Sequence, residues 1–360
     1  MIYEYWLANL TKIRSNKRIA ASEMLGGARK LYLAGRKELN SLEILTDEEI
    51  SMILEAKKSS HPQEAWEAFN KTGIQFIPYF SGHFPQKLLN IYQQPYALFV
   101  KGALPENRKS VAVVGARMCS EYGRSIAEKI GFELAACGVQ VISGMALGID
   151  SASHAGALKA GGKTFAILGC GCDNCYPSSS RNIYKNILDS GGGIISEYPP
   201  GSPPLTWHFP ERNRLISGLA DAVAVIEAKE KSGSLITADH ALDQGRDVYA
   251  VPGRIDDILS RGCNRLIAQG AGIICDTDSL LINLGLKKTA GKQKQNISEA
   301  KPDAAELKVL DYLDLHPVSM ETILEMTGLN LLEALNILEN LKQKGLVRES
   351  RHNYYCRCLR

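Results

Sequence analysis

The chain has 360 residues, of which 45% are hydrophobic and 22% charged, and this average composition excludes a largely disordered protein. Lys and Arg number 42 against 39 Asp and Glu, so the net charge of +3 excludes a polycation, and nucleic-acid binding would depend on local clusters of charge. No apolar run reaches the roughly 18 residues that span a bilayer, and residues 1–20 lack the apolar stretch of a signal peptide. Nine cysteines without a secretory signal indicate reduced thiols, so we expect a soluble cytoplasmic protein of two or three domains with no membrane partner.

Residues 1–75 are rich in Leu, Ala and Glu and predict short helices. The stretch 47–58 begins with acidic residues and repeats apolar residues three and four positions apart, which is typical of an amphipathic helix. Three prolines interrupt the next stretch, in which 96–100 (YALFV) predicts a short strand.

From about residue 110 the pattern changes to short apolar runs, each followed by a Gly-rich turn and an amphipathic stretch. We expect strands within 111–115, 141–148, 164–171, 193–201, 221–228, 247–253 and 272–276. Apolar runs that alternate with helices are typical of a parallel sheet covered on both faces. The sequence therefore predicts an α/β fold with a doubly wound sheet.

The last part of the chain predicts a separate helical unit. Residues 287–301 have five Lys against one Glu and no apolar periodicity, which indicates a solvated linker. Beyond it we expect helices at 305–315, 319–326 and 330–344, and a two-stranded wing at 345–358. Three helices and a hairpin in this order are typical of a winged helix-turn-helix.

The strongest local motif is V113-V-G-A-R-M-C-S-E-Y-G123, which joins a buried strand to a helix. Gly115 permits a sharp turn, Ser120 can cap the helix, and the helix N-terminus offers N–H donors to an anion. Arg117 lies in this turn, where its guanidinium would add a bidentate phosphate contact. The fingerprint G-x-G-x-x-G is absent, which disfavours NAD. The alternative for this loop alone is that Gly115 and Gly123 serve only to let the strand and the helix pack closely.

A second Gly-rich loop, with Gly144 and Gly148, follows the next strand, and we expect Asp150 to cap the helix after it. Two further turns precede helices: Lys231-Ser232-Gly233-Ser234 has an anion-binding layout, and 261–265 carries two arginines around Asn264. Because the carboxyl ends of parallel strands share one edge, we expect these loops to converge there.

The densest polar cluster is 207–218, in which Arg212, Asn213 and Arg214 stand just before an apolar run. Two arginines and an amide at a sheet edge suit backbone phosphates, and the neighbouring His208 and Phe209 supply a stacking surface. The alternative for either arginine is an ion pair in the core with one of two acids, Glu197 or Glu227.

No motif predicts catalysis. The segment 161–164 (GGKT) is not a phosphate-binding P-loop, because a helix precedes it and a strand follows. Cys170, Cys172 and Cys175 lie close together, but no fourth ligand can be named, which favours ordinary thiols and no metal. No Ser/His/Asp or Cys/His arrangement stands out, so we expect no catalytic residue and no cofactor.

Six motif stretches, in order over about residues 108–285, resemble the DNA-processing protein A (DprA/Smf) family. They are VGARMCSEYG, SGMALGIDSASHAGAL, GCGCDNCYP, SEYPPGSPPLTWHFPERNRLISGL, EAKEKSGSLITADHALDQGRDVYAVPG and GCNRLIAQGA. The resemblance implies an extended Rossmann-like single-stranded DNA-binding domain at 76–286. It also implies a helical (SAM/HhH-like) domain at 1–75, a linker at 287–303 and a winged-helix domain at 304–360.

The same resemblance implies a non-enzymatic homodimer that protects incoming single-stranded DNA and loads RecA recombinase onto it in natural transformation and recombination. The family's basic contacts fall on Arg117, Arg212, Arg214 and Lys231, and Arg181 is the nearest candidate for the basic residue after Tyr-Pro. Two positions depart from the family, since Ala116 replaces a Ser and Cys263, beside Asn264, replaces a Thr. Each change removes one hydroxyl donor from a phosphate loop and leaves the backbone N–H groups.

Two other classes of protein have weaker support from the sequence. A nucleotide phosphoribohydrolase-type enzyme would share a similar sheet, but its PGGxGTxxE motif corresponds here to KSGSLITADH, which lacks the equivalent acid. A winged-helix transcription regulator is disfavoured because residues 304–360 hold seven Lys/Arg against eight Asp/Glu, a net charge of −1.

Overall fold

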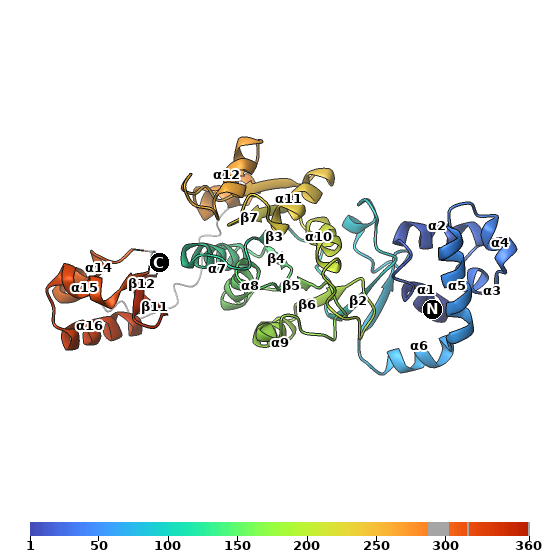
Figure 1. The fold of residues 1–360 in the computed structure, drawn as a ribbon, viewed down its shortest axis with the longest axis horizontal. Coiled ribbons are helices and arrows are strands. Elements are labelled where there is room, and N and C mark those ends of the chain that lie inside the picture. Colours follow the sequence, from blue (N-terminus) through green and yellow to red (C-terminus); the bar gives the residue numbers. More distant parts are fainter. Residues whose placement is uncertain (287–301, 315–316, 359–360) are drawn as a thin grey trace.

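The computed structural model describes residues 1–286, 302–314 and 317–358 (Figure 1). In this part of the chain a nine-stranded sheet has the order β1-β2-β6-β5-β4-β3-β7-β8-β9. The strands are β1 (Gln75–Pro78), β2 (Ala97–Gly102), β3 (Ser110–Val114), β4 (Gln140–Ser143), β5 (Thr164–Ile167), β6 (Gly193–Ser196), β7 (Ala222–Val225), β8 (Asp247–Ala250) and β9 (Gly272–Ile273). Neighbours from β6 to β9 are parallel, as predicted, whereas β1 and β2 form an antiparallel edge.

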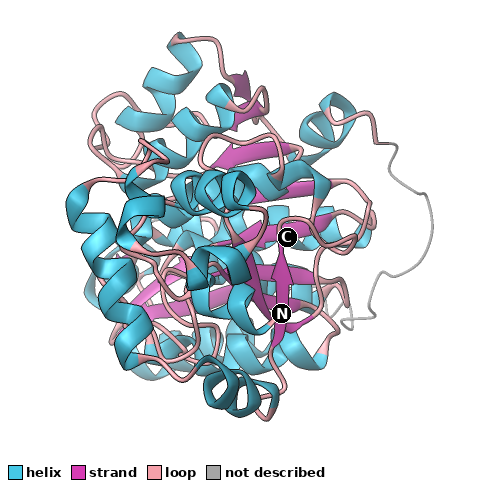
Figure 2. Cartoon of the chain, turned by 90° about the vertical axis from the view of Figure 1, so that its right-hand side faces the viewer, coloured by secondary structure: helices cyan, strands magenta, loops and turns pink. Residues whose placement is uncertain are grey.

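Helices cover both faces of the parallel strands (Figure 2). The sheet helices are α7 (Glu121–Ala136), α8 (Ile149–Lys159), α9 (Arg181–Asp189), α10 (His208–Leu219), α11 (Gly233–Asp243), α12 (Arg261–Ala268) and α13 (Thr277–Asn283). In β3, Val111 and Val113 belong to the core beneath α7 and α8, and the alternate residues Ala112 and Val114 belong to the core beneath α10 and α11. A strand buried on both faces is apolar throughout, which explains the continuous runs.

The N-terminal helices share their core with the antiparallel edge of the sheet. They are α1 (Ile2–Ala8), α2 (Ser15–Leu25), α3 (Ala28–Leu33), α4 (Arg36–Asn40), α5 (Asp47–Ser59) and α6 (Pro62–Asn70), so the helix expected over 47–58 is present. Their apolar core continues through Tyr96 and Phe99 of the sheet edge. Buried Arg18 donates to the carbonyls of Leu7 and Ala8, and its guanidinium carbon lies 5.6 Å from the centroid of the Tyr96 ring.

The C-terminal residues form a smaller unit with its own apolar core. Its elements are α14 (Ala304–Leu310), β10 (Val318–Ser319), α15 (Met320–Thr327), α16 (Leu331–Gln343), β11 (Val347–Arg351) and β12 (Tyr354–Arg357). The first helix ends at Leu310, earlier than predicted, and β10 joins the hairpin as a third strand. The predicted linker lies mostly outside the described residues, and the winged-helix interpretation stays a prediction. Among the described helices none is long and apolar enough to cross a membrane.

Helices α7 and α8 approach closely through glycines. A Cβ on Gly156 of α8 would lie 1.9 Å from the carbonyl oxygen of Glu128 in α7, and one on Gly131 would lie 2.2 Å from the oxygen of Ser153. A backbone oxygen cannot rotate away as a side chain can. These two positions therefore fix how near α8 packs to α7.

Gly156→Ala tests this contact. Alanine gains about 1 kcal/mol of helix propensity over glycine, but the clash with a backbone atom must be relieved by moving a helix. We expect a net decrease in the free energy of unfolding of about 1–3 kcal/mol, the usual cost of overpacking, measured by urea unfolding. Gly82→Ala is the control, because nothing lies within 4 Å of its added Cβ. An unchanged midpoint for Gly156→Ala would contradict the packing account.

Candidate functional site

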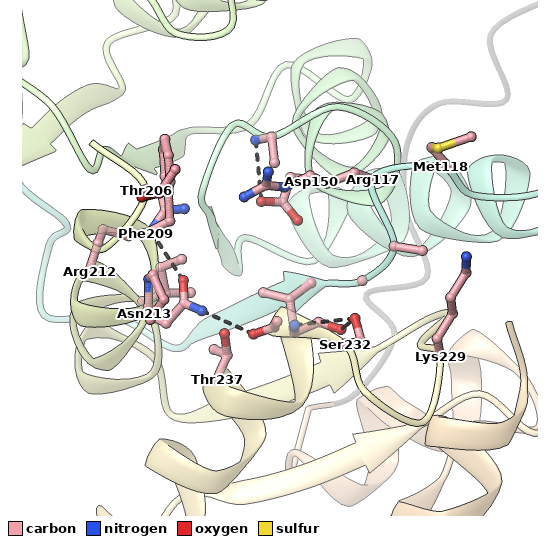
Figure 3. Close-up of a pocket in the computed structure, with 18 of the residues that line it drawn as sticks. Arg117, Met118, Asp150, Thr206, Phe209, Arg212, Asn213, Lys229, Ser232 and Thr237 are labelled. Carbon is pink, nitrogen blue, oxygen red and sulfur yellow. Dashed lines mark hydrogen bonds between the residues drawn. The ribbon is translucent and has the colours of Figure 1, made fainter. Parts of the chain in front are cut away.

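A cavity of about 520 Å³ opens at the carboxyl edge of the sheet, beside the adjacent strands β3 and β7 (Figure 3). The chain winds outward from β3 to β6 in one direction and from β7 to β9 in the other, so this is the topological switch point where open α/β sheets bind ligands. Its lining includes Arg117, Met118, Asp150, Tyr176, Thr206, Phe209, Asn213, Lys229, Lys231, Ser232, Gly233 and Ser234. Most of the predicted loops thus meet in one place.

Buried Glu227, just after β7, holds the loop that follows β3. Its carboxylate accepts hydrogen bonds from the backbone N–H of Ser120, at 2.8 Å, and from the Ser120 hydroxyl, while its carbonyl accepts from the N–H of Ala116 at 2.8 Å. Burial raises the pKa of Glu227, and the hydrogen bonds from Ser120 oppose that rise. The start of α7, predicted to receive an external anion, therefore already has an internal carboxylate on Ser120.

The glycines of this loop are sites of close approach. A Cβ on Gly123 would lie 2.3 Å from the carboxyl carbon of Glu227, and one on Gly115 would lie 2.6 Å from Cγ1 of Ile149. Gly148, in the neighbouring loop after β4, has φ +78°, and its Cβ would lie 2.3 Å from the carbonyl oxygen of Ala116. The packing interpretation of these glycines is therefore sound, and the packing in turn sets the position of Arg117.

Arg117 is exposed at the tip of this loop. Its guanidinium carbon lies 5.3 Å from the centroid of the Phe209 ring, a cation–π distance. Tyr176 also stacks on that ring, with the centroids 5.5 Å apart and the planes at 28°. The cavity wall therefore combines a cation with two aromatic rings, the pair of groups that suits a phosphate next to a base.

The opposite wall is the turn before α11. The backbone N–H of Ser234 donates to the Ser232 hydroxyl oxygen at 3.4 Å, and the Asn213 amide donates to the carbonyl of Gly233 at 3.1 Å. Lys229 and Lys231 are exposed on this wall. Among the described lining residues, they and Arg117 are the exposed cations.

Arg212 lines the cavity at its floor but is almost fully buried. It is 4% exposed and donates to the carbonyls of Gly144, at 3.0 Å, and Ile167, where β4 and β5 end. Burial lowers its pKa to about 10, which still leaves it charged at neutral pH. Asp150 adds a nearby negative charge that favours the charged guanidinium. Arg212 therefore supports the floor of the site.

Asp150 does not cap α8, so that prediction is wrong. The helix starts at Ile149 with Gly148 as its N-cap residue, and the carboxylate turns back to accept from the N–H groups of Gly144 and Ala146 at 3.1 and 3.3 Å. With Gly148 at φ +78° as the N-cap residue, the helix begins at Ile149, two residues before the start at Ser151 that a cap at residue 150 predicts.

Arg214 is 7% exposed and forms an ion pair with Glu197, the core alternative that the sequence left open. Neither Arg181, exposed at the start of α9, nor Asn264 lies among the lining residues. Asn264 instead donates to the carbonyl of Gly253 at 2.9 Å and accepts from its N–H at 3.1 Å. A role of these three residues in binding stays a prediction.

Lys229 and Tyr176 are among the lining residues that were not predicted as site residues. Lys229 stands just ahead of the Ser-Gly-Ser turn, so a second basic residue beside Lys231 was the available signal. No sequence signal pointed to Tyr176, because Phe209, the ring on which it stacks, is 33 positions away. In the described part of the chain no three His, Cys, Asp or Glu side chains are grouped to hold a metal ion.

Fold and site together define a doubly wound α/β protein with a basic, aromatic-lined cavity at its switch point. The family model for DNA recombination-mediator protein A matches residues 75–285. DNA processing protein DprA of Streptococcus pneumoniae is 44% identical over 201 residues, which cover 55% of this chain and 70% of that protein. Protein Smf of Escherichia coli K12 is 42% identical over 229 residues, covering 63% and 61%.

Two solved structures are also similar to this chain. The crystal structure of DNA processing protein A from S. pneumoniae matches with a TM-score of 0.69 and 33% identity, covering 78% of this chain and 97% of that one. The Helicobacter pylori protein, whose structure concerns its mode of binding single-stranded DNA, matches with a TM-score of 0.51 and 28% identity, covering 58% and 95%. This chain belongs to the DNA recombination-mediator protein A family.

Proposed function

We propose that this protein is a non-enzymatic single-stranded DNA-binding protein that acts in DNA processing. It protects incoming single strands in the cytoplasm and, as a homodimer, loads RecA recombinase onto them during natural transformation and recombination. The observation that carries the binding step is the grouping of Arg117, Lys229 and Lys231 around one cavity with stacked rings. Family membership and the single-stranded DNA studied with the H. pylori relative support the choice of ligand.

The chemistry of the cavity favours unpaired DNA. Lysine and arginine attract phosphates of any sequence, and aromatic rings stack on any base whose face is free. In a duplex those faces are covered by neighbouring bases. The exposed turn at Gly233 and the exposed lysines present donors, so the backbone would lie across the cavity with bases toward Phe209 and Tyr176.

The hydrolase alternative has less support. The lining carboxylate in the described cavity is Asp150, which is buried and already accepts two backbone hydrogen bonds. A general acid or base needs to reach a substrate atom.

We propose that residues 304–360 are a winged-helix accessory module and 1–75 a helical domain that braces the sheet edge. In the C-terminal unit, α16 exposes Leu331, Leu332 and Leu335 where a duplex reader would carry cations. Arg348 of β11 pairs with Glu121, the first residue of α7, at 2.8 Å. These features favour contact with protein over contact with duplex DNA.

Arg117→Ala tests whether the cavity binds single-stranded DNA. Loss of a charge-assisted phosphate contact should weaken oligo-dT binding roughly 10- to 100-fold and nearly equally for all sequences, because phosphates carry no base information. The slope of log affinity against log salt should fall in magnitude by about 0.7, the value for one single-strand phosphate. Fluorescence anisotropy at several salt concentrations measures both.

The matched control is Arg29→Ala, which removes an exposed arginine from α3 in the N-terminal helices. It should change neither affinity nor slope by more than a fraction of these amounts. A folded Arg117→Ala protein that behaves like Arg29→Ala would refute the assignment.

A chain truncated at residue 290 should keep most of its single-strand binding. The C-terminal core consists of residues 309–355 alone, so the cut opens no shared core, and every lining residue of the cavity is retained. We expect only a modest loss, from Lys292, Lys294 and Lys301, that fades as salt rises. If the folded fragment fails to bind oligo-dT in an anisotropy titration, the C-terminal unit is the main DNA reader and the groove proposal is wrong.

A further inference from the structure

Trp207 stands immediately before α10 and leaves 60% of its surface exposed. The chain has three tryptophans, and Trp6, by contrast, is only 5% exposed. Leaving a large apolar ring in water forgoes the stabilisation that burial of its area would bring. An exposed indole next to a cavity leaves a flat apolar surface free for a ligand.

The Trp207 indole packs against the buried ring of His208. Its centroid lies 5.9 Å from that of His208, edge to face at 80°. The His208 ring is buried and stacks on Tyr198 at 3.8 Å and 20°, and its Nδ1 lies 3.1 Å from the carbonyl oxygen of Gly169. The Tyr198 hydroxyl donates to Glu211 at 2.9 Å. A platform anchored in this way loses little conformational entropy when a ligand stacks on it.

Residues on both sides of Trp207 in the chain belong to the cavity lining. Thr206 and Phe209 line the cavity, whereas Trp207 itself is outside the lining. A Cβ on Gly169 would lie 3.0 Å from Cδ1 of Phe209 and 3.3 Å from the carbonyl carbon of His208, so the loop after β5 packs directly against the start of α10. Trp207 therefore stands between two lining residues in the chain, next to the aromatic wall that Phe209 forms.

We propose that Trp207 stacks on one unpaired nucleobase of the strand whose backbone lies in the cavity, and extends the site by a nucleotide. The inference depends on the proposed function and adds to it a second stacking position, separate from the Tyr176–Phe209 pair. The ligand is a nucleobase because a flat, sequence-tolerant partner suits an exposed indole beside a phosphate-binding groove. Duplex DNA, with its base faces covered, would not use it.

The test uses the full-length protein and its own fluorescence. In Trp66→Phe, which removes a tryptophan from α6, oligo-dT should quench the emission, because a base stacks on Trp207. In Trp207→Phe the quenching should disappear while affinity stays near that of the unaltered protein, since phenylalanine also stacks. Trp207→Ala should bind roughly 5- to 100-fold more weakly, the range for one stacked base.

Abasic oligonucleotides separate stacking from a structural role. Moving one abasic site along oligo-dT should reveal a position where loss of the base weakens binding to the unaltered protein but not to Trp207→Ala. Quenching by oligo-dT that persists in Trp207→Phe would overturn the inference, and so would a Trp207→Ala protein that binds as tightly as the unaltered one. Either result would leave the proposed DNA-binding cavity intact, and the exposed indole would then suit a protein partner. If the unaltered protein shows no binding of labelled oligo-dT, the proposed function itself has failed, and this inference with it.

Discussion

The site depends on one buried carboxylate. Glu227 ties the end of β7 to the loop after β3, through its side chain to Ser120 and through its backbone to Ala116. A buried carboxylate is costly unless it is hydrogen-bonded, and the N-terminus of α7 supplies donors and a favourable dipole. Gly123 is a glycine because this carboxylate fills the space of a side chain. The arrangement fixes both walls of the cavity relative to each other.

Arginines in this protein have two roles that depend on burial. Arg212 and Arg214 are inside, bonded to strand-end carbonyls and to Glu197, where they hold the polar ends of the sheet together. Arg117 is outside, free of ion pairs in the described structure and in contact with a ring. Only an exposed cation can exchange counterions for a phosphate without losing internal bonds. This division explains how a chain with a net charge of only +3 can hold a basic groove.

Local pattern was enough to predict the parallel sheet, its covering helices and the loops that meet at the switch point, because apolar runs and Gly-rich turns report backbone geometry. It could not tell which polar side chains face the cavity. Arg212 and Asn213 are adjacent and both line the cavity, yet Arg212 is buried and bonded to strand-end carbonyls, whereas Asn213 bonds to the turn before α11. The bond of Ser120 to Glu227 spans 107 positions, and no local pattern contains it.

The most direct test is a titration of the full-length protein with single-stranded and duplex oligonucleotides at several salt concentrations. With Arg117, Lys229 and Lys231 as the cavity's exposed cations, each worth about 0.7, the slope of log affinity against log salt for oligo-dT should be near −2 per site. Duplex of equal length should bind more weakly. A slope near zero, or tighter binding of duplex, would contradict the account.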